Sequence, residues 1–265
     1  MIRVADGAWA VVTGASSGIG AAIAEKLAAQ KVPLVLVARS AGALSEQAAA
    51  WRKRHGADVE ALPLDLSRPG AAAALFDATE GRGRPVDLLV NGAGFGWNGP
   101  QAEFETARFL ELLALNVVAT AELTHRFFVA MRSRRRGAIL NVASTSAFFP
   151  QPFFAAYGAS KAFILAFTHA LHEEAKRDGV TVTALCPGYT RTRFYQVAGM
   201  RGAKGTPFPE MTASRVAELG LDALGKGRAV VVTHGLDRLW IAMTRILPRS
   251  LPPRLAAAFF ARTRL

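Results

Sequence analysis

The sequence predicts an α/β protein with a doubly wound parallel sheet that folds as one domain. Its 265 residues alternate short apolar runs with longer stretches of helical periodicity. The short runs are apolar at consecutive positions, as expected for strands that are buried on both faces. Glycine-rich segments follow two of these runs, at residues 14–20 and 92–94. Strands joined by right-handed helical crossovers form such a sheet, and ligands bind beyond the carboxyl ends of the strands.

The strands are predicted where short apolar runs, often β-branched, stop at polar, glycine or proline positions. In chain order they cover residues 8–13, 32–38, 59–64, 86–90, 138–142, 180–185 and 229–233. The helices are predicted where apolar residues recur at spacings of three and four. They cover residues 19–30, 44–54, 71–78, 106–132, 155–177 and 216–224. Ser40 precedes the second helix as a potential N-cap, and Gly179 follows the fifth.

Composition and the first residues predict a soluble, cytoplasmic protein. Hydrophobic residues make up 51% of the sequence, which excludes a disordered chain. No uninterrupted apolar run approaches the roughly 18–20 residues of a membrane span, and no basic-then-apolar signal region opens the sequence. The single cysteine, Cys186, excludes a disulfide framework within the chain and fits a reducing compartment.

A net charge of +12 can attract nucleic acid, an anionic membrane or an anionic small molecule. The densest basic run, Arg132 with Arg134 to Arg136, stands at the predicted end of a helix, where cations complement the helix dipole. We favour that interpretation because no zinc-finger, RNA-recognition or helix-turn-helix signature accompanies the charge. We therefore expect no nucleic-acid partner.

The segment between the first strand and the first helix predicts a dinucleotide site. It reads Thr13-Gly14-Ala15-Ser16-Ser17-Gly18-Ile19-Gly20. Glycines at such a junction permit a tight turn and let backbone N–H groups approach a pyrophosphate at the helix N-terminus. The G-x-x-x-G-x-G spacing differs from the G-x-G-x-x-G fingerprint, so the prediction depends on the position between strand and helix.

The end of the second strand indicates which dinucleotide binds. NAD-binding units usually place an acid there on the ribose 2′-hydroxyl, whereas an arginine accommodates a 2′-phosphate. This chain has Arg39-Ser40 and no acid. A guanidinium is a bidentate partner for phosphate, which favours NADP(H). Because neither Ser17 nor Ser40 is basic, use of NAD as well, with Arg39 merely solvated, stays open.

Tyr157 and Lys161 form the candidate catalytic pair. Four residues apart on a predicted helix, they share one face. The pKa of a free phenol is roughly 10, and a fixed positive neighbour lowers it. Ser144, which precedes the tyrosine, would hold the oxygen of a reacting carbonyl or alcohol. Taken alone, the pair has an alternative interpretation, an ordinary helix with a solvated lysine.

Together these motifs resemble those of the short-chain dehydrogenase/reductase family in its single-domain form, from about residue 9 to residue 233. Asp65-Leu66 resembles the pair that contacts adenine, and Asn-Gly-Ala-Gly at 91–94 resembles a structural motif after the fourth strand. Pro187-Gly188 and Thr192 resemble the segment that holds the nicotinamide carboxamide. The cofactor-binding residues that the resemblance implies are Gly14, Ser16, Ser17, Gly18, Ile19, Gly20, Arg39, Asp65, Leu66, Asn91, Ala93, Gly94, Tyr157, Lys161, Pro187, Gly188 and Thr192.

The resemblance also implies a catalytic tetrad of Asn116, Ser144, Tyr157 and Lys161. Tyr157 would be the general acid in reduction and the base in oxidation, while Ser144 would hold the substrate oxygen. Lys161 would lower the pKa of the tyrosine and bond the nicotinamide ribose. Asn116 is a poor helix former within an apolar helical run. In the family, a local distortion there holds a water that relays protons towards the lysine.

The segment 189–212 resembles the family's variable substrate loop, often a lid. Apolar residues in this loop and near the motifs predict a hydrophobic or aromatic carbonyl substrate, with core or subunit packing as the alternative. They are Phe95, Trp97, Phe148, Phe149, Phe153, Phe154, Phe194, Tyr195, Met200 and Phe208. His169, His172 and Glu173 fit no metal-binding motif, and the family needs no metal.

We expect a Rossmann-like catalytic domain over residues 1–235 and a basic amphipathic extension over 236–265. The apolar residues of the extension are Leu236, Leu239, Trp240, Met243, Ile246 and Leu247 on one helical face before Pro248, then Phe259 and Phe260. Its arginines are Arg238, Arg245, Arg249, Arg254, Arg262 and Arg264. Such a segment can lie on an anionic membrane. We favour packing on the substrate loop or on a second subunit of a homodimer or homotetramer.

The sequence thus predicts an NADP(H)-dependent oxidoreductase that interconverts a carbonyl and a secondary alcohol. An NAD-linked alcohol dehydrogenase is the alternative within the enzyme class. A cofactor-binding regulator on the same fold is the alternative outside that class. The complete tetrad argues against it, because a sensor has no need of proton-transfer residues.

Overall fold

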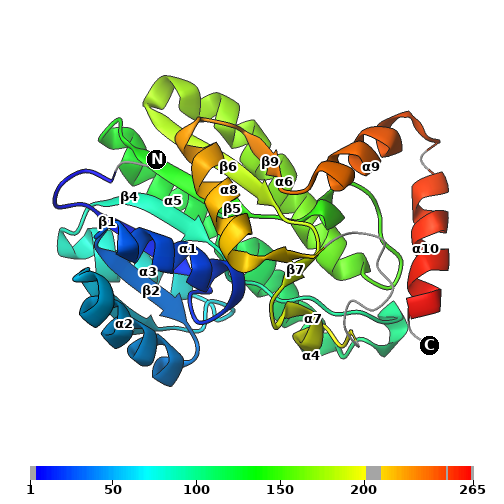
Figure 1. Cartoon of the computed structure of the whole chain (residues 1–265), viewed down its shortest axis with the longest axis horizontal. Helices are drawn as coiled ribbons and strands as arrows, with labels where there is room; N and C mark the ends of the chain where they lie inside the picture. The colour runs from blue at the N-terminus through cyan, green and yellow to red at the C-terminus, as the bar shows by residue number, and fades with distance from the viewer. Residues whose placement is uncertain (1–3, 201–209, 249, 264–265) are drawn as a thin grey trace.

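The computed structural model describes residues 4–200, 210–248 and 250–263. Seven parallel strands form the main sheet in the order β3-β2-β1-β4-β5-β6-β9 (Figure 1). The strand order reverses between β1 and β4, which confirms the predicted doubly wound arrangement and places a ligand-binding crevice at this point. The strands are β1 (Trp9–Thr13), β2 (Leu34–Ala38), β3 (Val59–Pro63), β4 (Val86–Asn91), β5 (Gly137–Val142), β6 (Val180–Cys186) and β9 (Val230–Val232), with β7 (Thr190–Arg191) and β8 (Met211–Thr212) paired separately.

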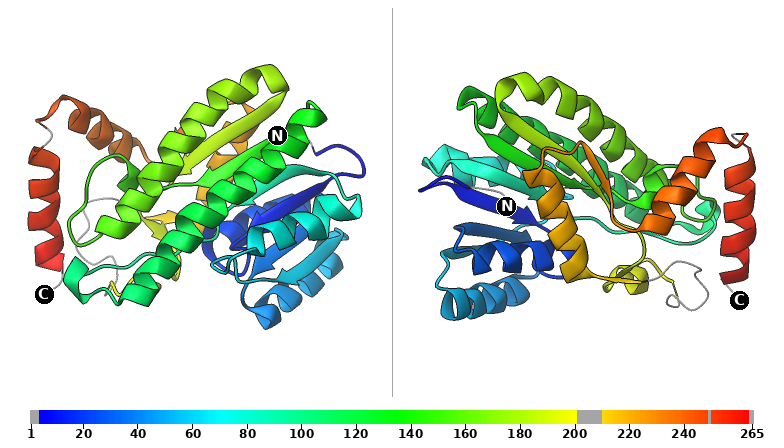
Figure 2. Two further views of the ribbon diagram at one scale, coloured as in Figure 1. Left: turned by 180° about the vertical axis from the view of Figure 1, so that it is seen from behind. Right: turned by 45° about the horizontal axis from the view of Figure 1, so that its top comes forward.

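Helices cover both faces of the sheet, as Figure 2 shows from two sides. The helices of the body are α1 (Gly18–Ala29), α2 (Ala41–His55), α3 (Ala71–Thr79), α4 (Thr106–Leu113), α5 (Thr120–Ser133), α6 (Ala155–Ala175), α7 (Phe194–Val197) and α8 (Ala213–Gly225). Successive residues of β1 belong to different cores. Ala10 and Val12 pack with α1, α2 and α8, whereas Val11 packs with α3, α5 and α6. Burial on both faces explains why the strands are apolar at consecutive positions.

The structure moves several predicted boundaries by a few residues. β2 starts at Leu34 rather than at residue 32, because Lys31 turns the chain with a φ of 59° and Pro33 has no N–H for a ladder. α2 starts at Ala41 rather than at residue 44. Ser40 is its N-cap residue, as predicted, but its side chain makes no capping hydrogen bond.

The long helix predicted at 106–132 contains a distortion. A π-helical turn, η3 (Ala114–Ala119), joins α4 to α5, and Asn116 lies within it. Such turns are rare and often occur at functional sites.

By length and hydropathy alone, the helical segment Thr106–Ser133 could span a membrane. A span was not expected from the sequence, because no uninterrupted apolar run in it is long enough. In the structure, 44% of the most apolar stretch of this segment is buried. It packs on β4 and β5, as a core helix of a globular fold does.

Two helices, α9 (Gly235–Ile246) and α10 (Leu251–Thr263), follow the last strand. α9 is the helix predicted before Pro248. The views agree that the two helices project from the body at the end farthest from α2 (Figures 1 and 2). The predicted boundary at residue 235, between a catalytic domain and a C-terminal extension, stays a prediction. The expectations for Arg245, Phe208, Arg249, and the side chains from residue 259 onward lie outside the described residues.

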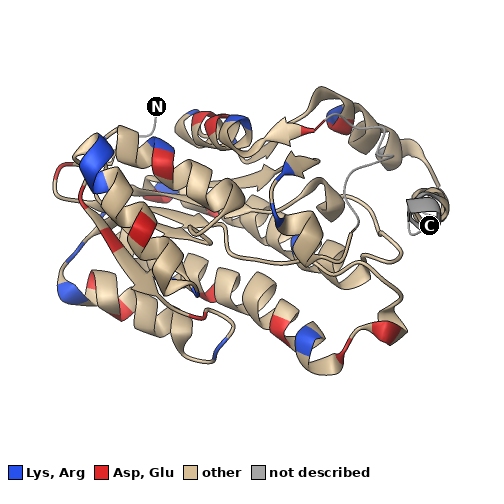
Figure 3. Ribbon diagram, turned by 60° about the horizontal axis from the view of Figure 1, so that its bottom comes forward, with Lys and Arg blue, Asp and Glu red and all other residues tan. Residues whose placement is uncertain are grey.

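The basic run after α5 contacts acidic residues of the same chain. Arg134 contacts Glu80 at 2.7 and 2.9 Å, and Arg136 reaches the buried Asp87 at 2.8 Å. Arg132 lies in the last turn of α5, where it also complements the helix dipole. Figure 3 shows the positions of basic and acidic residues interspersed along the helices of the body. The run therefore stabilises the end of α5 and its surroundings, in line with the favoured interpretation.

Candidate active site

A cavity of about 1020 Å³ lies at the carboxyl edge of the sheet, where the sequence predicts the site. It extends from the loop after β1, past the ends of β2, β4, β5 and β6, to α9 and α10. Every predicted cofactor residue except Asn91 lines it. Its volume is at the upper end of the usual range for ligand sites, roughly 300–1,000 Å³. That leaves room for a dinucleotide together with a second ligand.

The glycine loop is packed so closely that side chains have no room. A Cβ on Gly14, whose φ is +68°, would lie 2.6 Å from the carbonyl oxygen of Gly92. A Cβ on Gly18 would meet the Thr192 methyl at 3.2 Å, which shows that the segment after β6 reaches over the loop. Ser17 makes no capping hydrogen bond at the start of α1. The first N–H groups of α1 are thus available to a phosphate.

Thr13 connects the glycine loop to the end of β4. Its Oγ1 accepts hydrogen bonds from the N–H groups of Gly92 and Ala93, at 3.1 and 3.2 Å. The same hydroxyl donates to the Val90 carbonyl at 3.3 Å. The two loops that the dinucleotide would touch are therefore held together before it binds.

Arg39 and Asp65 lie at the adenosine end of the cavity. Burial opposes ionisation of Asp65, but hydrogen bonds from Ser67 and the nearby cation of Arg39 hold the pKa of the carboxyl below its usual value. The guanidinium of Arg39 donates to Glu111 of α4 at 3.0 Å and is more than half exposed. Glu111 also pairs with Arg108. Arg39 therefore already has an acidic partner, which sequence spacing did not indicate.

Asn91 is a correction to the predicted cofactor set. Its Nδ2 donates to Asn141 Oδ1 at 2.9 Å and to Thr124 Oγ1 at 3.0 Å. Asn141 in turn donates to Thr168 at 2.9 Å. This buried network ties β4 and β5 to α5 and α6, behind the cavity wall. Asn91 is thus structural, because its side chain points from the strand into the helical layer.

Tyr157 and Ser144 meet in the cavity, in hydrogen-bonding contact with each other. Burial raises the pKa of the Tyr157 phenol to about 12, and the Ser144 hydrogen bond opposes this only in part. Lys161 is not among the groups that shift this pKa, so the lowering of the phenol pKa by the lysine stays a prediction. At neutral pH the phenol therefore holds a proton, which a general acid must have in order to donate it.

Lys161 is buried beside the tyrosine. Its Nζ donates to the Val142 carbonyl at 2.7 Å and lies 5.8 Å from the centre of the Tyr157 ring. Burial lowers the pKa of its ammonium group to about 8, because removing the charge from water disfavours it. The helix spacing did bring the two side chains together, but their burial changed both pKa values.

Asn116 lies one layer behind the cavity and is fully buried. Its Oδ1 accepts from the Phe95 N–H at 3.1 Å, and its Nδ2 donates to the Phe95 carbonyl at 2.9 Å and to Ser160 Oγ at 3.2 Å. A Cβ on Gly94 would touch both Asn116 Oδ1, at 3.0 Å, and Lys161 Nζ, at 3.5 Å. The π-helical turn thus places the Asn116 side chain against the loop of Gly94 and Phe95, which lies between Asn116 and Lys161.

The half of the cavity near α9 is lined by aromatic rings. Phe154 and Phe194 pack on the Tyr157 ring, with centroids 4.8 and 5.0 Å away. Trp240 of α9 packs edge-on against Phe149 at 6.2 Å. The predicted apolar residues found in the lining are Phe95, Phe149, Phe154, Phe194, Tyr195 and Met200. Trp97, Phe148 and Phe153 are absent from it, and Trp97 instead stacks on Phe104 at 4.3 Å.

Asp237 of α9 is a lining residue that the sequence reasoning missed. It is only 6% exposed, and its carboxylate lies so close to Gly188 that a Cβ there would overlap it. Burial raises the pKa of the carboxyl, and His234 opposes this in part. Arg193 also lines the cavity. The sequence offered one indication of Asp237, a single acidic residue on an otherwise apolar helix. That helix lies outside the segment that carries the family motifs.

With this geometry in hand, the chain can be compared with known proteins. The model of the short chain dehydrogenase family matches residues 8–200. The very-long-chain 3-oxoacyl-CoA reductase of Anas platyrhynchos is 29% identical over 227 residues, 83% of this chain and 72% of that protein. The ketoacyl reductase HetN of Nostoc sp. is 30% identical over 255 residues, 92% of this chain and 87% of that protein.

Comparison with solved structures indicates the same family. A short-chain dehydrogenase from Sphingobium yanoikuyae in complex with NADPH has a TM-score of 0.81 at 30% identity, covering 91% of this chain and 96% of the other. The chain belongs to the short-chain dehydrogenase/reductase family. It is an oxidoreductase of that family with a site for NAD(P).

Proposed function

We propose that the chain is an NADP(H)-dependent reductase of a carbonyl group on a long, apolar substrate. One observation carries the proposal. Tyr157 and Ser144 meet at the point where a glycine-lined dinucleotide cleft continues into an aromatic chamber closed by α9. The likeness to reductases of 3-oxoacyl-CoA and ketoacyl compounds supports an acyl chain as the apolar part.

Each residue of the site has a separate role in the proposed reaction. The bound cofactor supplies a hydride to the carbonyl carbon. Tyr157 gives its phenolic proton to the carbonyl oxygen, and Ser144 Oγ donates a hydrogen bond to the same oxygen as negative charge develops on it. Lys161, held by the Val142 carbonyl, faces the negative charge left on the phenolate and stabilises it. Asn116 keeps the Phe95 loop in place beside the lysine.

The proposal is tested by the oxidation of NADPH and NADH with a panel of ketones and 3-oxoacyl thioesters of increasing chain length. We expect kcat/KM to rise by up to roughly tenfold for each methylene pair buried in the aromatic chamber, since one buried CH₂ contributes about 0.8 kcal/mol. A preference for small, highly charged keto acids would contradict the apolar chamber. NADPH binding without turnover of any carbonyl would favour a cofactor-binding regulator instead.

Arg39 is the residue on which NADP preference depends. We expect Arg39→Ala to raise the KM for NADPH by about 10- to 100-fold, since a hydrogen bond to a charged group contributes about 1.5–3 kcal/mol. The KM for NADH should change little, because NADH has no 2′-phosphate. Steady-state kinetics with both cofactors measures the difference. The matched control is Arg54→Ala, which removes an exposed arginine paired with Glu25 at 3.2 Å. An unchanged KM for NADPH would mean that Glu111 holds Arg39 away from the 2′-phosphate, and an equal loss with both cofactors would mean that Arg39 supports a part that they share; either result contradicts the proposal.

We also propose that a second copy of the chain binds at α5 and α6. Val129 of α5 and Phe163 of α6 are large apolar side chains exposed there, and Val118 is exposed in η3, the turn before α5. Charges on the same helices are balanced, as in the Glu122–Arg126 pair at 2.8 Å, so that two copies would not repel each other. Light scattering should give the mass of a dimer or tetramer for the wild type and a smaller mass for Val129→Glu. A monomeric wild type would contradict the proposal.

A further inference from the structure

The outer face of α9 carries an apolar stripe that the rest of the described chain leaves exposed. Its residues are Leu236, Leu239, Met243 and Ile246, spaced by three and four and therefore on one side of the helix. Leu239 is 60% and Ile246 85% exposed. α10 adds two exposed leucines, Leu251 and Leu255. Clusters of this kind mark an interaction surface rather than scattered surface residues.

The opposite side of α9 lines the cavity. Asp237, Trp240 and Ile241 line it, and Asp237 and Ile241 are each 6% exposed. Trp240, which the sequence placed on the same face as Leu239, thus points inward, since successive helical residues are 100° apart. α9 is therefore apolar on two sides. Within the described part of the chain, only one of these sides is covered.

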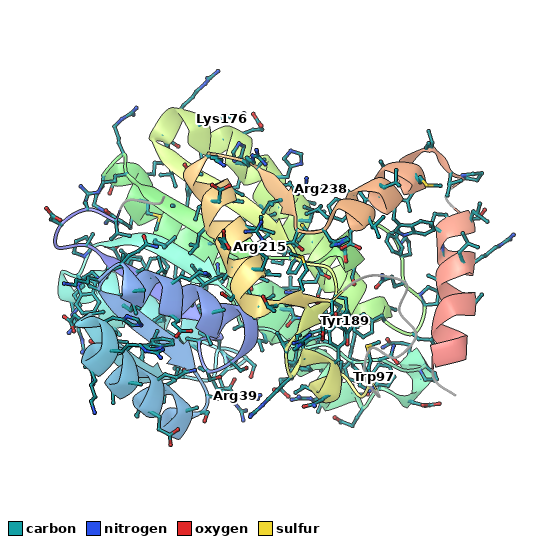
Figure 4. The ribbon with its side chains drawn as sticks, viewed as in Figure 1. Arg39, Trp97, Lys176, Tyr189, Arg215 and Arg238 are labelled. Carbon is teal, nitrogen blue, oxygen red and sulfur yellow. The ribbon has the colours of Figure 1, made fainter. Side chains whose placement is uncertain are left out.

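The charge of residues 236–265 indicates whether a second copy of the chain or a lipid surface would cover the stripe. Residues 236–265 contain six arginines and a single acid, Asp237, which faces the cavity. Arg238 and Arg254 are exposed beside the stripe, and Figure 4 shows Arg238 at the first turn of α9. A second copy of the same segment would bring like charges together. A surface of anionic lipid attracts them and also accepts the apolar stripe.

We propose that α9 and α10 dock the protein on an anionic lipid surface, with Leu236, Leu239, Met243 and Ile246 in the acyl boundary and Arg238 and Arg254 at the headgroups. The position of the two helices, projecting at one end of the body, leaves them free to lie against such a surface (Figure 1). Docking does not depend on the proposed reaction. It would, however, bring an apolar substrate to the cavity, because Leu255 is both exposed and part of the lining.

The test is co-sedimentation of the full chain with vesicles of phosphatidylcholine, with and without phosphatidylglycerol. We expect the wild type to sediment with the anionic vesicles and to be released by salt, which screens the arginines. The double variant Leu239→Glu, Ile246→Glu should partition about 100-fold more weakly, since each change removes a buried side chain from the lipid. Both residues lie outside the cavity lining, so turnover of a water-soluble ketone should be unchanged and reports an intact fold.

Leu110→Glu is the matched control, because Leu110 is a 56% exposed leucine that belongs to α4 and not to α9 or α10. It should sediment like the wild type. The proposal is overturned if the wild type stays in the supernatant, or if the double variant sediments as well as the wild type does. It is also overturned if light scattering shows that the double variant dissociates an oligomer while no form binds vesicles. In that case the stripe is a subunit contact.

Discussion

Replacing Tyr157 with phenylalanine is expected to lower kcat for carbonyl reduction by about 10²–10⁴-fold, the usual contribution of a positioned general acid. The ring stays in place, because Phe154 and Phe194 pack on it at 4.8 and 5.0 Å and not on its hydroxyl. NADPH affinity should change little, and the melting temperature should stay within a few degrees. Steady-state turnover and NADPH fluorescence titration measure these effects separately.

Tyr195→Phe provides the matched control for this change. Tyr195 lines the same cavity, its ring packs at 4.4 Å from Tyr189, and burial raises the pKa of its phenol as well. Nothing in its position brings it to Ser144, so we expect turnover within a few-fold of the wild type. If Tyr195→Phe were as inactive as Tyr157→Phe, the loss would come from the aromatic packing and not from proton donation.

The sequence predicted the doubly wound parallel sheet and the close packing of the glycine loop because both follow from local patterns. Consecutive apolar positions report burial on both faces, and glycines between strand and helix report a close approach of backbones. The structure confirms this at Gly14, which has no space for a Cβ beside Gly92. The family resemblance implied a distortion at Asn116, and the π-helical turn over Ala114–Ala119 agrees with it.

Other features depend on contacts between distant segments, which a local pattern does not contain. Glu111 reaches Arg39 from a different layer of the fold, 72 positions later in the chain. Asn91 lies in a cofactor motif, but its direction is set by partners on β5 and α5. Burial of the helix raises the pKa of the Tyr157 phenol, and the spacing of residues along the chain does not contain this effect. Asp237 enters the cavity only because α9 folds back over Gly188.

The largest expected effect on the fold comes from Gly20→Ala, at the first turn of α1. Its φ is compatible with alanine, so the only cost is steric. A Cβ there would lie 2.8 Å from the carbonyl carbon of Gly14, closer still to its oxygen, and 3.1 Å from the Thr13 oxygen. All of these atoms are backbone atoms and cannot rotate away. The loop that receives the pyrophosphate must therefore shift.

We expect Gly20→Ala to lower the free energy of unfolding by about 1–3 kcal/mol, the usual cost of overpacking, and to weaken NADPH binding at least tenfold. Thermal unfolding and fluorescence titration measure the two effects. Gly42→Ala is the control, because Gly42 is also helical, in α2, and a Cβ there meets nothing within 4 Å. That change should stabilise the protein by up to about 1 kcal/mol, through the higher helix propensity of alanine. If both variants bound NADPH like the wild type, the close contact between Gly20 and Gly14 would not be what shapes the cofactor site.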